Sequence, residues 1–181
     1  MLTEETTAKL KRFFAIKWVI YSVLVISIFM YFIVTIILKQ KGIRFLEDDS
    51  IIVILRNIFA VIAAVIMLTA FCLRRNLTQP EKFLESIEKK EIDPAIIEKL
   101  LGKIADDSIR SIGKVLLISN TIDIISWVLF ESVAIFGFVL SFLTGDILYV
   151  QAFGAAALVA MALTRPNYTT FMNIVNHASS A

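Results

Sequence analysis

Glu131 is an acidic residue inside a stretch of the chain that otherwise contains no ionisable side chain. The nearest ionisable residues are Asp123 before it and Asp146 after it, and the residues between them are mostly apolar. A charge in the hydrocarbon of a bilayer is costly, so such a carboxylate faces protein or water, or takes up a proton. The chemistry that this position favours is therefore the binding of a proton or a cation within a membrane.

Arg56 is a second charged residue within an apolar stretch, and two interpretations fit it. Its side chain can extend to the outer headgroups while its methylene groups stay in the apolar layer. Alternatively it pairs with Glu131, because helix rise places the two residues roughly 9 Å apart in depth, which long side chains can just bridge. Glu131 also has a purely structural interpretation, as a packing residue hydrogen-bonded to Ser126, Asn57 or a water molecule.

The segments that must position these residues are long enough to cross a bilayer. The chain has 181 residues, of which 58% are hydrophobic, and its mean hydropathy is +0.81. A transmembrane helix needs about 20 predominantly apolar residues. Four segments meet this need, residues 13–38, 51–73, 124–143 and 147–163, and the last is the shortest. The sequence thus predicts an all-α membrane protein with four transmembrane helices in a single membrane domain, residues 1–181.

The distribution of lysine and arginine predicts the orientation of these helices. Four basic residues lie in the N-terminal flank, nine between the second and third spans, and one after the fourth span. Only three lie between the first and second spans, and none lies in the turn between the third and fourth. Cytoplasmic loops are enriched in lysine and arginine, so we expect both termini and the middle segment to be cytoplasmic. The abundance of Ile and Lys and the lack of an organelle signal favour a bacterial cytoplasmic (inner) membrane.

The middle segment, residues 74–115, is expected to form short amphipathic helices in the cytoplasm. Thr78-Gln-Pro-Glu81 is typical of a capping box, and Asp93-Pro94 is typical of a second helix start. Behind this second start, apolar residues recur at helical spacing and form one stripe: Ile96, Ile97, Leu100, Leu101 and Ile104. The stripe fits a helix that lies on the membrane or against the bundle. It also fits a docking face for a partner subunit, with Ile97, Leu100, Leu101 and Ile104 as the docking candidates.

Small residues predict that the third and fourth spans pack closely against each other. At about 100° per residue, one face of the third span carries small or polar residues, with Glu131 at its margin: Asp123, Ser126, Ala134, Gly137 and Ser141. The fourth span offers Ala152, Ala156 and Ala160 at four-residue spacing. Small residues at this period let two helix backbones approach closely in lipid. These residues are therefore the candidates for helix packing.

Two local features concern the ends of the third span. Thr144-Gly-Asp146 predicts a tight turn into the fourth span. At its other end, we expect one helix from about residue 109 to residue 143, with a break at Ser119-Asn120 as the alternative, because these side chains compete for backbone hydrogen bonds.

Several classes of function lack the residues that they need. The single cysteine, Cys72, cannot form an internal disulfide, and the single histidine, His177, is far from it in sequence, so no metal site is expected. No Ser/His/Asp or Cys/His set is available for nucleophilic catalysis. The net charge of +2 is near balance and does not favour a nucleic-acid partner. We therefore expect no catalytic centre, no cofactor and no nucleic acid.

One segment of the third span carries a recognisable pattern around Glu131. It is Ile122-Asp-Ile-Ile-Ser-Trp-Val-Leu-Phe-Glu-Ser-Val-Ala-Ile-Phe-Gly-Phe-Val-Leu140. This segment resembles the ion-binding helix of the rotor proteolipids of rotary ATPases, the c or K subunits, in which a membrane carboxylate is followed by a small residue and an Ile-x-Gly-x-Val-like run. The resemblance implies that Glu131 is the ion-binding carboxylate and that Ala134 and Gly137 are its packing neighbours. The chain also resembles a group of uncharacterised four-span bacterial membrane proteins in which a Glu-x-x-Ala-Ile-aromatic-Gly segment precedes a final hairpin helix.

Two functions of different classes follow from these patterns. The first is a structural or accessory subunit of a membrane complex, whose partners are the lipid bilayer and other membrane subunits or a second copy of the chain. The second is translocation of a proton or cation through Glu131, with Arg56 as its charge partner. Neither function is an enzymatic activity.

Overall fold

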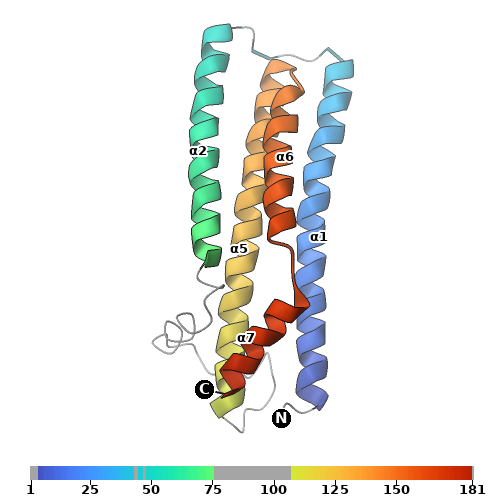
Figure 1. The fold of residues 1–181 in the computed structure, drawn as a ribbon. Helices are drawn as coiled ribbons and strands as arrows, with labels where there is room; N and C mark the ends of the chain where they lie inside the picture. The colour runs from blue at the N-terminus through green and yellow to red at the C-terminus, as the bar shows by residue number, and fades with distance from the viewer. Residues whose placement is uncertain (1–3, 43–44, 47, 76–106, 181) are drawn as a thin grey trace. The chain divides into compact units, whose positions relative to one another are not determined.

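A computed structural model describes residues 4–42, 45–46, 48–75 and 107–180 of the chain (Figure 1). These residues form helices and contain no strand. In chain order the helices are α1 (Glu4–Gln40), α2 (Asp49–Arg75), α5 (Asp107–Thr144), α6 (Leu148–Leu163) and α7 (Tyr168–Ser180). The all-α class expected from the sequence is confirmed for this part of the chain.

Three of these helices are long and apolar enough to cross a membrane. They are α1 over Thr7–Gln40, α2 over Asp49–Arg75 and α5 over Ile112–Thr144, and each contains one of the first three predicted spans. α6 is also apolar but has only 16 residues. The chain is therefore a membrane-embedded helical protein.

The two local features at the ends of the third span are both confirmed. α5 runs without a break through Ser119 and Asn120. The expected continuous helix is therefore confirmed, and the alternative, a break at these two residues, is wrong. At its other end, Gly145 has a φ of 72°, a left-handed conformation that glycine adopts without strain. Its N–H donates to the carbonyl oxygen of Ser141 at 2.9 Å, which closes the turn into α6.

The described helices belong to two compact units. The terminal unit comprises Met1–Val19, Leu73–Ile124 and Pro166–Ala181, and the bundle unit comprises Ile20–Cys72 and Ile125–Arg165. The terminal unit has an apolar core to which α1, α5 and α7 contribute: Leu10, Ile112, Val115, Leu116, Phe171 and Val175. Phe14 extends this core, with its ring centroid 5.2 Å from that of Tyr168 in an edge-to-face contact.

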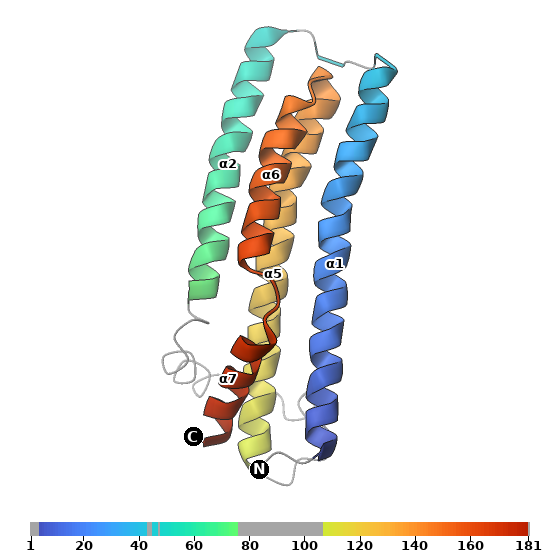
Figure 2. The ribbon, with the colours of Figure 1, turned by 45° about the vertical axis from the view of Figure 1, so that its right-hand side comes forward.

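In the bundle unit, α1, α2, α5 and α6 run side by side, as both ribbon views show (Figures 1 and 2). Aromatic rings connect α5 to its neighbours. Phe138 stacks on Tyr31 of α1 with a centroid distance of 5.4 Å, and Phe136 stacks on Phe59 of α2 at 5.1 Å. Such offset ring pairs add stabilisation beyond the apolar area that they bury.

α5 and α6 approach each other closely at Gly137. A Cβ atom at this position would lie 2.6 Å from Phe153 Cβ and 2.7 Å from the carbonyl oxygen of Tyr149, so only glycine allows α5 and α6 to come this close. Ser141 adds a polar contact, because its Oγ accepts a hydrogen bond from the N–H of Val150 at 2.8 Å. This bond satisfies one of the free N–H groups in the first turn of α6.

The predicted packing residues are distributed unequally between buried and exposed positions. Ala134, Gly137, Ser141 and Ala160 are buried, whereas Ala152 and Ala156 are exposed. The face that α6 buries consists of Val150, Gly154, Ala157, Ala160 and Met161. The physical reason is that a four-residue step advances more than one full turn, by roughly 40°, so a row of alanines drifts away from a straight contact line.

The predicted docking stripe of Ile97, Leu100, Leu101 and Ile104 lies outside the described residues, as does most of the middle segment.

Candidate functional site

The carboxylate of Glu131 is held by two hydroxyl groups from α1 in the bundle unit. The hydroxyl of Tyr31 donates to Glu131 Oε1 at 3.0 Å, and Ser27 Oγ is in hydrogen-bond contact with the same oxygen. Ser27 and Tyr31 are one helical turn apart, so they present their hydroxyls on the same face of α1. Ser27 Oγ also donates to the carbonyl oxygen of Leu24 at 2.7 Å. A partly buried carboxyl group thus sits among neutral oxygen atoms within an apolar helix pair.

The residues considered as partners of Glu131 on sequence grounds lie elsewhere. Arg56 and Asn57 are exposed on α2, and within the described residues Arg56 makes no ion pair with Glu131. Ser126 is fully buried, yet the oxygen atoms at the carboxylate come from Ser27 and Tyr31. The sequence analysis did not connect Ser27 or Tyr31 to Glu131. The link depends on the rotation of α1 against α5, and no local pattern encodes that rotation.

The terminal unit contains a second site, which sequence reasoning missed. Lys17 Nζ forms an ion pair with Asp123 Oδ2, and Arg74 Nη1 lies 2.8 Å from Asp123 Oδ1. The side chains of Lys17 and Asp123 are only 6% and 8% exposed, and that of Arg74 is 20% exposed. One buried carboxylate therefore faces two cations from two other helices, α1 and α2.

A signal for this second site was present in the sequence. Lys17 precedes the uncharged residues 18–38, Arg74 directly follows the predicted span 51–73, and Asp123 directly precedes the predicted span 124–143. With spans that alternate in direction, these three positions mark the same side of the membrane. Two basic residues and one acidic residue at the same side of the membrane would have predicted that Asp123 pairs with Lys17 and Arg74.

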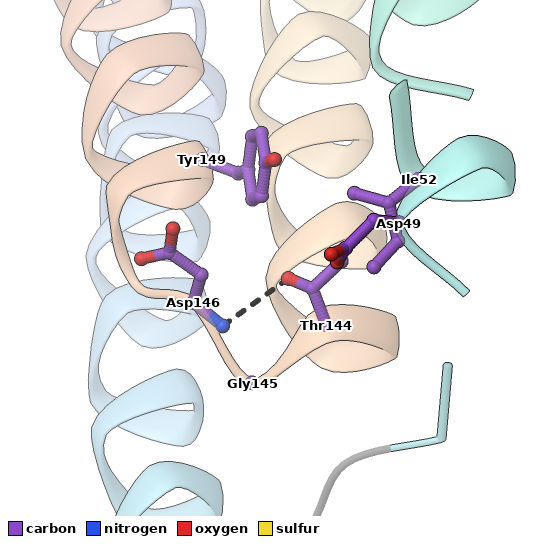
Figure 3. Close-up of a pocket in the computed structure, with 6 residues that line it drawn as sticks. All are labelled: Asp49, Ile52, Thr144, Gly145, Asp146 and Tyr149. Carbon is purple, nitrogen blue, oxygen red and sulfur yellow. Dashed lines mark hydrogen bonds between the residues drawn. The ribbon is translucent and has the colours of Figure 1, made fainter. Parts of the chain in front are cut away.

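A third polar feature lies at the turn between α5 and α6 in the bundle unit (Figure 3). It is a cavity of about 330 Å³ lined by Asp49, Ile52, Thr144, Gly145, Asp146 and Tyr149. Two of its polar side chains, those of Thr144 and Asp146, take part in the turn. Asp146 Oδ1 accepts from the N–H of Leu148 at 3.0 Å, and the N–H of Asp146 donates to Thr144 Oγ1 at 3.2 Å. This arrangement starts α6 and leaves Asp49, in the first turn of α2, as the one carboxylate of the lining without a part in the turn.

A metal site or a similar known protein could also indicate the function of the chain. In the part of the chain that the structure describes, no group of three or more His, Cys, Asp or Glu side chains could hold a metal ion. Comparisons with protein families, with curated proteins and with solved structures find no match for this chain. The surroundings of Glu131 and Asp123 are therefore the features of this chain that point to a function.

Proposed function

We propose that the chain is a four-span protein of a bacterial inner membrane, with both termini in the cytoplasm. α6 is the fourth span in this proposal. Its 16 residues extend roughly 24 Å at the rise of an α-helix, which is shorter than the ~30 Å hydrocarbon core and requires a nearly untilted helix or local thinning of the bilayer. The bias of lysine and arginine toward the N-terminal flank and the middle segment supports the orientation.

Within this frame, we infer that the chain binds and transfers a proton at Glu131. The observation that supports this function is the pairing of the carboxyl group with two neutral hydroxyls, from Ser27 and Tyr31, and with no lysine or arginine of the described residues. A carboxylate with a fixed cationic partner stays ionised, because the partner favours the charged form. A carboxyl group among neutral donors in an apolar surrounding can exist in both protonation states.

Three contacts link Leu24 O, Ser27 Oγ, Glu131 Oε1 and the Tyr31 hydroxyl. Each hydroxyl carries a single hydrogen, so Ser27 donates to Leu24 O or to Glu131 Oε1, whereas Tyr31 donates to Glu131 Oε1. The carboxyl group of Glu131 is thus linked to α1 through hydroxyl hydrogens alone.

Glu131→Gln is the direct test of proton transfer. We expect the purified protein in liposomes to carry a proton flux, read with a pH-sensitive dye, and the variant to lose it because an amide neither takes up nor releases a proton near neutral pH. Asp146→Asn is the matched control, since it removes a carboxylate at the turn and should leave the flux intact. Equal flux from wild type and Glu131→Gln would rule out this function.

A second function, that of an accessory subunit without catalytic centre, is favoured by the outer surface of α2. Only Ile52, Ala63 and Ala70 of this 27-residue helix are buried, and the polar residues Arg56 and Asn57 are exposed within its apolar run. Arg56 can extend toward the headgroups, but the short side chain of Asn57 cannot, and an amide in lipid favours a hydrogen bond to another helix. A membrane subunit or a second copy of the chain would supply that helix.

Purification from native membranes tests the accessory function. We expect Asn57→Leu to lose a co-purifying protein, or to reduce the size of the solubilised complex, while the neighbouring apolar substitution Ile58→Leu does not. A Leu100→Glu and Ile104→Glu variant tests docking by the predicted cytoplasmic stripe in the same experiment. Recovery of the same complex from all of these variants would count against this function.

A further inference from the structure

The ion network of the terminal unit has more positive than negative charge among its three members. Asp123 offers one oxygen to Lys17 and the other to Arg74, so both carboxylate oxygens are engaged by cations. Arginine carries five N–H donors in a planar fork, and a single carboxylate oxygen at 2.8 Å uses few of them. The side chain of Arg74 is 20% exposed, so the remaining donors are accessible from outside the protein.

The hydrogen bonding of this region is incomplete. Arg74 Nη1, Asn120 Oδ1 and Asp123 Oδ1 are the buried side-chain atoms that have no hydrogen-bond partner within the described residues. Arg74 Nη1 and Asp123 Oδ1 are at ion-pair distance without the alignment of a hydrogen bond. All three atoms belong to the terminal unit. Buried polar groups are normally satisfied in native proteins. Arg74 Nη1 is the donor among the three atoms, so Arg74 lacks an acceptor, and an anion would supply one.

The position of the network in the sequence indicates where that partner comes from. Lys17 and Asp123 stand directly before uncharged or apolar runs, and Arg74 stands directly after one. In the proposed membrane arrangement, three span ends that meet through their side chains lie at one depth, at the level of the lipid headgroups. The chemical group that is abundant at this level and matches the arginine fork is a phosphate.

We propose that Lys17, Arg74 and Asp123 form a binding site for a phosphate-bearing anion, with Arg74 as the residue that contacts it. Asp123 orients both cations, and the guanidinium of Arg74 favours a net negative group. An anionic phospholipid headgroup meets this requirement at the membrane surface. A zwitterionic headgroup carries an ammonium group that compensates the phosphate charge, so it gains less binding free energy at this site. Free phosphate shares the recognition chemistry and is the second source of the ligand.

Lipid binding to the full chain, delipidated in detergent and followed by native mass spectrometry, tests the site. We expect phosphatidylglycerol to bind more tightly than phosphatidylcholine. Arg74→Gln should weaken phosphatidylglycerol binding about tenfold, through loss of a charge-assisted contact. Arg74→Lys, which keeps the charge but loses the planar fork, should weaken it less. The adjacent exposed residue provides the matched control, because Arg75→Gln removes the same charge and should change binding little.

The outcomes separate the two sources of the ligand and include a clear refutation. Displacement of phosphatidylglycerol by inorganic phosphate would support the site with the free anion as ligand, and resistance to displacement would support it with the lipid. Equal weakening in Arg74→Gln and Arg75→Gln would overturn the proposal, since it would indicate attraction to general surface charge. Equal binding of phosphatidylglycerol and phosphatidylcholine would overturn it as well. Arg74→Gln leaves the Lys17–Asp123 pair intact, and unchanged helical content by circular dichroism verifies its fold.

Discussion

Two carboxylates of α5, those of Asp123 and Glu131, are eight residues apart in the sequence but have opposite surroundings. Asp123 in the terminal unit is paired with two cations, Lys17 and Arg74. Glu131 in the bundle unit contacts only the neutral hydroxyls of Ser27 and Tyr31. A cationic partner favours the charged form of a carboxylate, and neutral hydroxyls supply no such charge. The comparison teaches that the neighbouring helices, more than the position of an acidic residue in an apolar helix, decide which groups its carboxylate contacts.

The units that hold these residues differ in the same way. The terminal unit combines an apolar core with buried ion pairs. The bundle unit shows no ion pair among its described residues and is held by stacked rings and by close helix contacts at Gly137 and Gly154. Substitutions that remove charge should therefore affect the first unit most, and substitutions that add volume should affect the second.

The largest expected effect is that of removing the negative charge of Asp123. Asp123→Asn leaves Lys17 and Arg74 buried side by side without a carboxylate, and breaking a buried pair in this way costs about 3–5 kcal/mol. Glu131→Gln should cost less than about 1 kcal/mol, because glutamine still offers an acceptor to Tyr31 and a donor to Ser27. Unfolding in mixed detergent micelles, followed by circular dichroism, measures both variants. Similar losses of stability in the two variants would contradict the view that Asp123 is held by charge and Glu131 by neutral hydrogen bonds.

A smaller effect is expected from adding a methyl group at the helix contacts of the bundle unit. In Gly137→Ala the new Cβ would meet the carbonyl oxygen of Tyr149 at 2.7 Å and Phe153 Cβ at 2.6 Å, atoms that cannot move without the backbone. Overpacking of this kind costs about 1–3 kcal/mol. Gly154→Ala is the matched control, because its nearest neighbours are Phe32 ring atoms at 2.8 and 3.0 Å, which a side-chain rotation can move.

Both glycine substitutions gain the same helix propensity, so the difference between their free energies of unfolding isolates the cost of the contact. Gly137→Ala is expected to be the less stable of the two in the same unfolding measurement. Equal stability would mean that α5 and α6 can separate slightly at no cost, and it would contradict the view that close packing holds the bundle unit together.

Smaller effects than those of the glycine contacts are expected from the hydroxyls around Glu131. Tyr31→Phe keeps the ring that stacks on Phe138 and removes one hydrogen bond, and Ser27→Ala removes the other contact. Each should lower stability by about 1 kcal/mol. The sharper measurement is the infrared C=O stretch of a protonated carboxyl group, assigned by its absence in Glu131→Gln. Either hydroxyl variant should shift this band, and a band unchanged by both would show that the hydroxyls do not bind the carboxyl group.

Sequence reasoning predicted the helical class, the long third helix and the turn at Gly145, because each depends on local properties of the chain. It also identified Glu131 as the unusual residue and Gly137 as a packing position. It did not find Ser27 and Tyr31 as partners of Glu131, and it counted Lys17 only as part of a basic flank. It placed Ala152 and Ala156 in the packing row of the fourth span, whereas the structure leaves them exposed. In each case the missing information was the rotation of one helix against another, to which apolar helices in lipid give little sequence signal.

By itself, the sequence determined that the chain consists of apolar helices and that an acidic residue lies within one of them. Length and hydropathy are sufficient for this, because backbone hydrogen bonds in an apolar environment must be made within the helix. Only the tertiary structure decided which carboxylate meets cations and which meets hydroxyls. Asp123 and Glu131 share one helix and one side-chain chemistry, and the neighbours that distinguish them come from residues more than 40 positions away in the chain.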